Sequence, residues 1–286
     1  MEIFEVPVQG FCGGVRRAVD LARKTVRENP DRKVTVLGSL VHNAYVNDEL
    51  RSMGVEIVEA KGKTRLDLLD DVEDGILIFT AHGVSDKVRE KAKAKGLECI
   101  DASCPFVLST QSLIKKKRAE GYTIFYIGKK GHPEAEGAME SEENFFLIEK
   151  KDDLPEEDFE KIFVTNQTTM SVLDLEDLFD EIKARYPHAE FCSEICTATR
   201  LRQQAVMDLQ DKSIDLLIVI GDPQSNNTRK LSLTGKKAGI ERILQIESSD
   251  DLRKEDFENV KKVAVTSGAS TPDFLLKDVI ARLHSF

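Results

Sequence analysis

Three cysteines lie at equal intervals along this chain. Cys12, Cys104 and Cys196 follow one another at a spacing of 92 residues. Cysteine thiolates bind zinc and iron, and three distant thiolates share one centre only where the fold brings three segments together. The equal spacing therefore predicts a cysteine-ligated metal or cluster site near a pseudo-threefold axis.

The segments that carry these cysteines repeat as well. Helical patterns follow the cysteines over residues 15–28, 107–119 and 198–212. Apolar runs that end in glycine come next, at 34–38, 122–128 and 216–221, and runs that end in threonine follow at 76–80, 162–165 and 263–266. Continuous Val, Ile, Leu and Phe runs between helices are typical of buried parallel strands. The chain therefore predicts an α/β fold of three repeated parallel-sheet units.

One strand of the repeat is displaced. Predicted strands at 98–100 and 189–191 precede Cys104 and Cys196, whereas the third repeat ends without one and residues 3–6 precede Cys12. We expect the N-terminal strand to complete the third sheet. The predicted units are 13–103, 104–195 and 196–286, the last completed by residues 1–12.

Polar side chains follow the strands at equivalent places. Four residues after the glycines come His42, His132 and Ser225; after the threonines come His82, Thr168 with Thr169, and Ser270; Asn43, Glu134 and Asn227 lie on the same loops. Ligands of open parallel sheets bind beyond the carboxyl ends of the strands. Unrelated loop residues have no reason to stay in register, so these side chains predict one shared pocket.

The groups in this pocket suit an anion and a proton transfer. His42, His82, Ser225, Asn227 and Ser270, together with N–H groups at helix N-termini, can hold a phosphate or diphosphate with little Lys or Arg. Glu134 and Thr168 can manage a proton near a substrate hydroxyl. An apolar pocket disfavours the charged carboxylate, so we expect Glu134 to stay protonated long enough to donate.

Two inorganic centres fit three thiolates and an open position. Zinc takes four ligands, and the nearby Cys99 and Cys192 keep a zinc site open as an alternative. A [4Fe–4S] cluster on three cysteines leaves one iron free to act as a Lewis acid and can deliver single electrons. Cys99 and Cys192 fall in or beside predicted strands, and we expect them to fill the core.

Composition narrows the class of protein. The formal charge of −10 argues against general nucleic-acid binding. The apolar runs are far shorter than the roughly 20 residues that span a bilayer. The first residues show no basic and apolar signal pattern, and five cysteines in that setting suit metal or redox chemistry rather than disulfides. We expect a cytoplasmic protein that binds neither nucleic acid nor membrane.

At these residues the chain resembles the 4-hydroxy-3-methylbut-2-enyl diphosphate reductases, iron–sulfur enzymes of the non-mevalonate isoprenoid pathway. The similar segments are the cysteine motifs at 10–15, 101–105 and 195–199, the histidine loops at 41–43 and 81–85, and the loops at 131–137, 166–171, 225–228 and 267–273. Four residues differ from those usual in that family: Gln9 replaces Arg, Gly13 replaces Ala, Lys130 replaces Glu and Asn226 replaces Ser.

The resemblance implies a fold and an activity. Three units related by pseudo-threefold symmetry would surround a central [4Fe–4S] cluster held by Cys12, Cys104 and Cys196. The enzyme would reductively dehydroxylate (E)-4-hydroxy-3-methylbut-2-enyl diphosphate to isopentenyl and dimethylallyl diphosphates. Reduced ferredoxin or flavodoxin would supply the electrons.

The same resemblance assigns roles to side chains. Glu134 would be the proton source, with Thr168 assisting and His132 lying alongside the substrate. The residues implied to contact the substrate are His42, His82, His132, Thr168, Ser225, Asn226, Asn227 and Ser270.

Two other functions remain open at this point. A quinolinate-synthase-like dehydratase also resembles three α/β units around a three-cysteine cluster, but it condenses and dehydrates without net reduction. A non-catalytic iron–sulfur sensor would use the cluster to report oxygen or iron.

Overall fold

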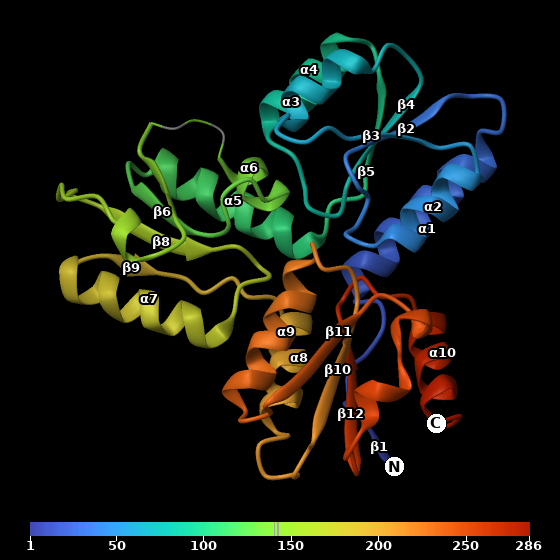
Figure 1. Ribbon diagram of the computed structural model, residues 1–286. Helices are drawn as coiled ribbons and strands as arrows, with labels where there is room; N and C mark the ends of the chain where they lie inside the picture. Colours follow the sequence, from blue (N-terminus) through green and yellow to red (C-terminus); the bar gives the residue numbers. More distant parts are fainter. Residues whose placement is uncertain (140, 142) are drawn as a thin grey trace. The chain divides into compact units, whose positions relative to one another are not determined.

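A computed structural model describes residues 1–139, 141 and 143–286 and divides the chain into two compact units (Figure 1). Unit 1 contains residues 1–15, 42–44 and 196–286; unit 2 contains 16–41 and 45–195. The described strands form three four-stranded sheets, one in unit 1 and two in unit 2, and the strands pair in parallel throughout. The predicted class, an α/β fold with three parallel sheets, is therefore confirmed.

The sheet of unit 1 is covered by helices on both faces. In order across the sheet, its strands are β1 (Glu2–Glu5), β12 (Lys262–Ser267), β10 (Leu216–Ile220) and β11 (Arg242–Ile246). Its helices are α8 (Thr197–Met207), α9 (Asn226–Lys237) and α10 (Asp273–Leu283), with short 3₁₀ turns at Ser249–Asp251 and Lys254–Phe257. In Figure 1, α8 and α9 lie on one side of these strands and α10 on the other.

Strand β10 shows why a continuous apolar run is needed here. Ile218 and Ile220 pack in a cluster with Val279 of α10. The alternate residues Leu217 and Val219 pack in a second cluster with Leu231 of α9. Because successive side chains of a strand point to opposite faces, a strand that is buried on both faces, such as β10, favours apolar residues at successive positions.

The N-terminal strand joins the far end of the chain. Within β1, Ile3 lies opposite Val263 of β12 in parallel register. Strands β5 and β9, which precede Cys104 and Cys196, hold the corresponding edge position in the two sheets of unit 2. Each sheet thus has the same strand order relative to its cysteine. Three separate domains with the boundaries given above stay a prediction.

Unit 2 contains two such sheets. The first has the order β3 (Glu56–Val58), β2 (Val34–Leu37), β4 (Ile76–Phe79) and β5 (Glu98–Asp101); the second has β7 (Phe145–Ile148), β6 (Thr123–Ile127), β8 (Ile162–Asn166) and β9 (Glu190–Phe191). The helices are α1 (Gly13–Glu28, whose first three residues belong to unit 1), α2 (Ala44–Ser52, whose first residue does), α3 (Arg65–Leu68), α4 (Asp86–Ala94), α5 (Pro105–Ala119), α6 (Pro133–Ala138) and α7 (Val172–Arg185), with 3₁₀ turns at Leu69–Asp71 and Lys151–Asp153.

The core of unit 2 follows the same alternation. On β6, Phe125 and Ile127 pack with Ile182 of α7. Ile124 and Tyr126 belong to the cluster on the other face, which includes residues of α5 and α6. The helices that carry the candidate site are therefore fixed against a fully buried strand.

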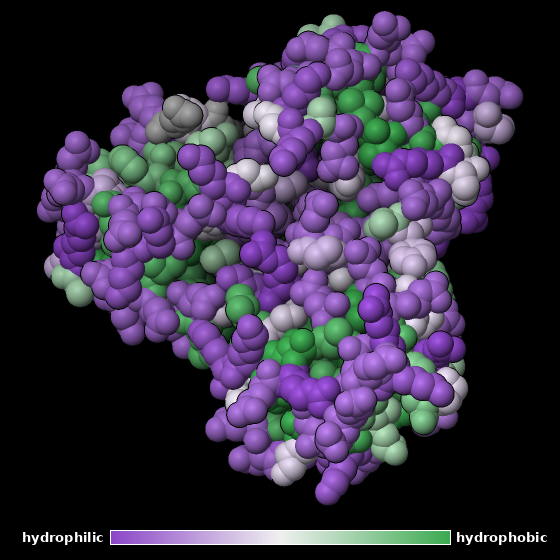
Figure 2. Space-filling view, viewed as in Figure 1, coloured by the Kyte–Doolittle hydropathy of each residue, from purple (hydrophilic) through white to green (hydrophobic). Residues whose placement is uncertain are grey.

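The surface is mainly hydrophilic. Figure 2 shows hydrophilic residues over most of the visible face. In the part of the chain that the structure describes, no helix combines the length and apolar character needed to cross a membrane.

Two buried tyrosines differ in the hydrogen bonding of their hydroxyl groups. The Tyr126 hydroxyl has no hydrogen-bond partner among the described residues, whereas the Tyr186 hydroxyl donates to the Pro155 carbonyl. A buried polar group without a partner costs free energy, and a satisfied one contributes about 1 kcal/mol. We expect Tyr126→Phe to raise the free energy of unfolding by about 1 kcal/mol and Tyr186→Phe to lower it by about 1 kcal/mol. Urea denaturation of both variants checks this, and a destabilised Tyr126→Phe protein would contradict it.

Candidate active site

The three equally spaced cysteines all lie at helix N-termini. Cys104 and Cys196 are the N-cap residues of α5 and α8. Cys12 immediately precedes α1, and its Sγ accepts the Val15 N–H at 3.5 Å. None of the three forms a disulfide, and each is half-buried. The positive end of a helix favours thiolates and the negative charge of an iron–sulfur cluster.

Unit 1 links the Cys12 loop to two predicted substrate residues. The Cys12 N–H donates to the Ala269 carbonyl at 3.0 Å. The next residue, Ser270, donates its hydroxyl to the His42 carbonyl at 2.8 Å and is itself 6% exposed. A cysteine, a serine and a histidine from three distant parts of the sequence are therefore fixed in one part of unit 1.

The Cys196 helix is linked to the start of α9 in the same unit. Thr199 Oγ1 lies 3.2 Å from Cys196 Sγ and donates to Asn227 Oδ1 at 3.1 Å. This bond orients the Asn227 side chain through its oxygen, so its amide nitrogen remains the donor end. Thr199 was missed by the sequence reasoning. Its signal was a hydroxyl three residues after a cysteine, which places both on one face of a helix.

The N-terminus of α9 has the character of an anion site. Ser225 is its N-cap residue, and Ser225 Oγ accepts the Thr228 N–H at 3.4 Å. Because Oγ accepts, the Ser225 hydroxyl hydrogen can donate elsewhere. Asn226, the first residue of the helix, is 7% exposed. Unpaired N–H groups, hydroxyls and amides at a helix start bind phosphate without a full positive charge.

Unit 2 contains a second set of connected residues. The Cys104 N–H donates to the carbonyl of Ala81, the residue before His82, at 2.9 Å. The His82 and His132 rings make an edge-to-face contact with centroids 5.5 Å apart. His132 Nδ1 accepts the Glu134 N–H at 3.1 Å, so the proton of the neutral His132 ring is on Nε2. Proline at the first position of α6 favours this tight start of the helix.

Glu134 is a buried carboxyl held by one neighbour. Its side chain is 3% exposed. Its two oxygens accept the Thr168 N–H at 2.7 Å and the Thr168 hydroxyl at 3.1 Å. Burial raises the pKa of Glu134 to about 7, and the two hydrogen bonds from Thr168 oppose this increase. Near neutral pH this carboxyl can therefore hold and release a proton.

The helix that carries Glu134 is anchored by an ion pair. Glu136 accepts the Arg65 backbone N–H at 2.6 Å and lies 3.2 Å from Arg65 Nη1. Arg65 is 8% exposed, and burial lowers its pKa against the charge of Glu136. A pair that is shielded from water in this way fixes the orientation of α6.

The two remaining cysteines have different surroundings. The expectation that Cys99 fills the core is wrong. Cys99 lies on the edge strand β5 and is exposed to solvent. Cys192 is half-buried and packs beside the cluster of apolar residues on β6. Burial, followed by the Glu194 carboxylate, raises the pKa of Cys192 to about 11. Neither Cys99 nor Cys192 lies at a helix N-terminus as Cys104 and Cys196 do.

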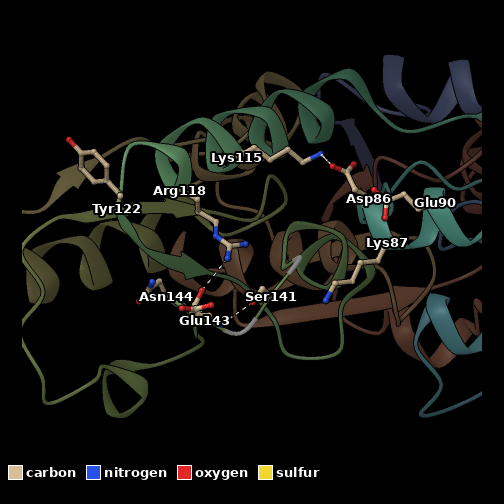
Figure 3. Close-up of a pocket in the computed structure, with 10 residues that line it drawn as sticks. Asp86, Lys87, Glu90, Lys115, Arg118, Tyr122, Ser141, Glu143 and Asn144 are labelled. Carbon is tan, nitrogen blue, oxygen red and sulfur yellow. Dashed lines mark hydrogen bonds and ion pairs between the residues drawn. The ribbon is translucent and has the colours of Figure 1, made fainter.

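A hollow elsewhere in unit 2 is separate from these residues. It has a volume of about 610 Å³ and lies beside α4 and α5 (Figure 3). The predicted site residues do not line it. Lys115 pairs with Asp86 at 2.6 Å, and Arg118 donates to the Glu143 carbonyl at 3.2 Å.

The residues present fit an iron–sulfur cluster. Three cysteines outside any disulfide lie at the N-termini of three helices, and the charges of Cys12 and Cys196 oppose the lowering of the Arg202 pKa by burial. Sequence reasoning missed Arg202, which was one charged residue within a predicted helix. Parallel sheets, helix-capping thiols, a neutral anion site and a buried acid define the class: an α/β cluster enzyme that acts on an anionic substrate.

Comparison with known proteins identifies the family. Residues 3–284 match the family model described as "LytB protein", and the chain belongs to this family. Proteins of this family are [4Fe–4S] enzymes, so the predicted cofactor is confirmed.

Similar curated and solved proteins carry one enzyme name. The chain is 44% identical to the 4-hydroxy-3-methylbut-2-enyl diphosphate reductases of Macrococcus caseolyticus and Bacillus cytotoxicus, over all of its own length and 90% and 91% of theirs. It superposes on the Plasmodium falciparum reductase with a TM-score of 0.90 and 32% identity, covering 98% of this chain and 87% of that one. A second reductase structure, described as the terminal enzyme of the non-mevalonate pathway, gives 0.68 and 30% with full coverage of both chains.

The raised pKa of Glu134 makes stability depend on pH. A carboxyl whose pKa is higher in the folded protein, about 7 against 4.5, contributes stability below pH 4.5 that is lost as the pH rises through 7. Glu134→Gln removes the ionisation, so this variant should match the wild type at pH 4.5 and exceed its free energy of unfolding by about 3 kcal/mol above pH 8. Urea denaturation across this range measures the difference, with Glu160→Gln, at an exposed carboxyl, as the control variant. Parallel curves for Glu134→Gln and the wild type would contradict the shift.

Proposed function

We propose that this protein reductively dehydroxylates (E)-4-hydroxy-3-methylbut-2-enyl diphosphate. Two electrons and two protons remove the allylic hydroxyl as water and leave isopentenyl and dimethylallyl diphosphates. Relatives of that name, 44% identical across the whole chain, support this activity. The observation that carries it is the Glu134–Thr168 pair, because a buried acid with a pKa of about 7 supplies protons to a site that excludes water.

Cys12, Cys104 and Cys196 hold the cluster in this proposal. Their free thiols and their positions at helix N-termini support the assignment. When bound, the [4Fe–4S] cluster supplies the electrons and a Lewis-acidic iron.

The diphosphate is bound by uncharged donors and histidines. The residues we assign to it are His42, His82, Ser225, Asn226, Asn227 and Ser270. The N-terminus of α9 and the orientation of Asn227 by Thr199 support this role. Binding through neutral groups leaves the proton donor free of a cation that would favour its ionised form.

Glu134 delivers a proton in the reaction. Thr168 holds both carboxyl oxygens, so the acid stays in one orientation, and its hydroxyl can pass a hydrogen bond on toward the substrate. His132 lies beside the substrate, and its backbone-bonded Nδ1 leaves Nε2–H as the donor. In this arrangement Thr168 and His132 contact the substrate.

The reaction needs an external electron donor. We assign this role to a reduced ferredoxin or flavodoxin, since the cluster accepts electrons one at a time. We also place the reaction in the cytoplasm, because free cysteine ligands and an open iron need a reducing compartment.

Turnover should depend on the Glu134 proton. With the cluster loaded, Glu134→Gln should lower kcat by about 100-fold or more, since general acid catalysis contributes at least that much. The wild-type kcat should fall tenfold per pH unit above pH about 7, as the acid ionises. Anaerobic assays with reduced viologen measure both.

Glu160→Gln is the matched control, because it makes the same change at an exposed carboxyl of unit 2 outside the proton path and should keep kcat within about twofold. A Glu134→Gln enzyme that remains active would show that Glu134 is not the proton donor. No turnover by the loaded wild type would favour the dehydratase or the sensor. An assay of the loaded protein with iminoaspartate and triose phosphate tests the dehydratase function directly.

The ligand assignment predicts the iron content of cysteine variants. Cys104→Ser should lose most of its iron and the visible absorbance of the cluster, because a hydroxyl replaces an essential thiolate. Cys99→Ser, at an exposed position, should keep both. Iron analysis after anaerobic reconstitution decides the matter, and a fully loaded Cys104→Ser protein would exclude Cys104 as a ligand.

A further inference from the structure

Arg202 is a buried cation that pairs with no carboxylate among the residues that the structure describes. Arg202 is 2% exposed and lies on helix α8, whose N-cap residue is Cys196. Buried arginines normally pair with an acid, as Arg65 does with Glu136. Burial lowers the pKa of Arg202, and the charges of Cys12 and Cys196 oppose this decrease.

The guanidinium joins the two cysteine segments of unit 1. Nη2 donates to the Gly10 carbonyl at 2.7 Å, and Nη1 donates to the Ala198 carbonyl at 3.2 Å. Gly10 lies two residues before Cys12, and Ala198 lies two residues after Cys196. Nε has no hydrogen-bond partner among the described residues. A hydrogen-bonded side chain therefore connects the two loops that carry two of the proposed ligands.

The Gly10 backbone is shaped to make this contact. Its φ is +70°, in the region that favours glycine, and a Cβ there would lie 1.9 Å from Asp273 Oδ1. The Gly10 N–H donates to Ser267 Oγ at 2.9 Å. The position of the Gly10 carbonyl is thus fixed from both sides, and Arg202 binds a rigid acceptor rather than a loose loop.

We propose that Arg202 is a positioning residue for the cluster, which ties the Cys12 loop to the Cys196 helix and holds a permanent positive charge beside two thiolates. The inference rests on the proposed ligand set. Arginine keeps its charge at physiological pH. When an electron enters the cluster, the nearby cation stabilises the reduced form more than the oxidised form. Arg202 therefore raises the reduction potential and makes electron transfer from the donor more favourable.

The reduction potential tests this directly. In the reconstituted protein, Arg202→Gln and Arg202→Met should each lower the equilibrium constant for one-electron reduction by about tenfold, a fall of ~59 mV. Arg202→Lys keeps the charge and should stay near the wild-type potential. Anaerobic redox titrations followed by absorbance and electron paramagnetic resonance measure these values without any substrate.

Arg65→Met is the matched control, because it removes a buried arginine whose ionisable partners are the carboxylates of Glu136 and Glu59. It should lose stability and leave the potential unchanged. Equal potentials in all Arg202 variants, or a fall in Arg202→Lys as large as in Arg202→Gln, would overturn the inference.

Failure to load the cluster is also informative. If the neutral variants fold, by circular dichroism, but hold no iron while Arg202→Lys does, the positive charge is what the thiolates need and the inference stands. If Arg202→Lys also folds without iron, the charge is not sufficient and the inference fails. A wild-type protein that cannot hold a [4Fe–4S] cluster would instead refute the proposed ligand set.

Discussion

Parallel strand pairing is the constraint on which the site depends. In each sheet the strands run the same way, so the loops that follow them meet at one edge, together with the N-termini of the next helices. Those N-termini carry unpaired N–H groups and partial positive charge. Cys104, Cys196 and Ser225 are the N-cap residues of three such helices. The backbone of the fold thus supplies binding positions for anionic groups at the helix N-termini, independently of the side chains there.

Each unit adds a different chemistry to these places. Unit 1 holds neutral donors and the fixed charge of Arg202, which suit anion binding and cluster reduction. Unit 2 holds Glu134, whose acidity is set by burial and by Thr168. A lysine or arginine beside Glu134 would lower the pKa and keep the proton off the carboxyl near neutral pH. In the proposed reaction, binding the diphosphate through Ser, Asn and His keeps such a cation away from the proton donor.

The sequence predicts the central strands and one edge strand of each sheet, but not the other edge strand. The run Leu216–Ile220 is buried on both faces and is apolar at every position, so its pattern is unambiguous. Strand β3 (Glu56–Val58) has three residues, of which Glu56 is exposed, and β11 begins at the exposed Arg242; neither matches the strand pattern that repeats. The helix predicted to reach Lys212 ends at Met207, although Leu209 beyond it is still buried. The helical spacing of apolar residues thus continues past Met207, although the backbone there is no longer helical.

The site residues divide in the same way. His132, Glu134 and Thr168 could be found because each follows a strand at a repeated position. Residues that follow parallel strands lie in the loops at the carboxyl edge of the sheet. Arg202 and Thr199 lie inside a helix, where a single Arg or Thr is ordinarily a surface residue. Their role depends on which distant backbone they meet, as Arg202 does at Gly10. Such contacts join residues 192 positions apart, and local pattern carries no information about them. A cation that tunes a cluster is therefore a property of the folded chain, and only the packing of α8 against the Gly10 loop defines it.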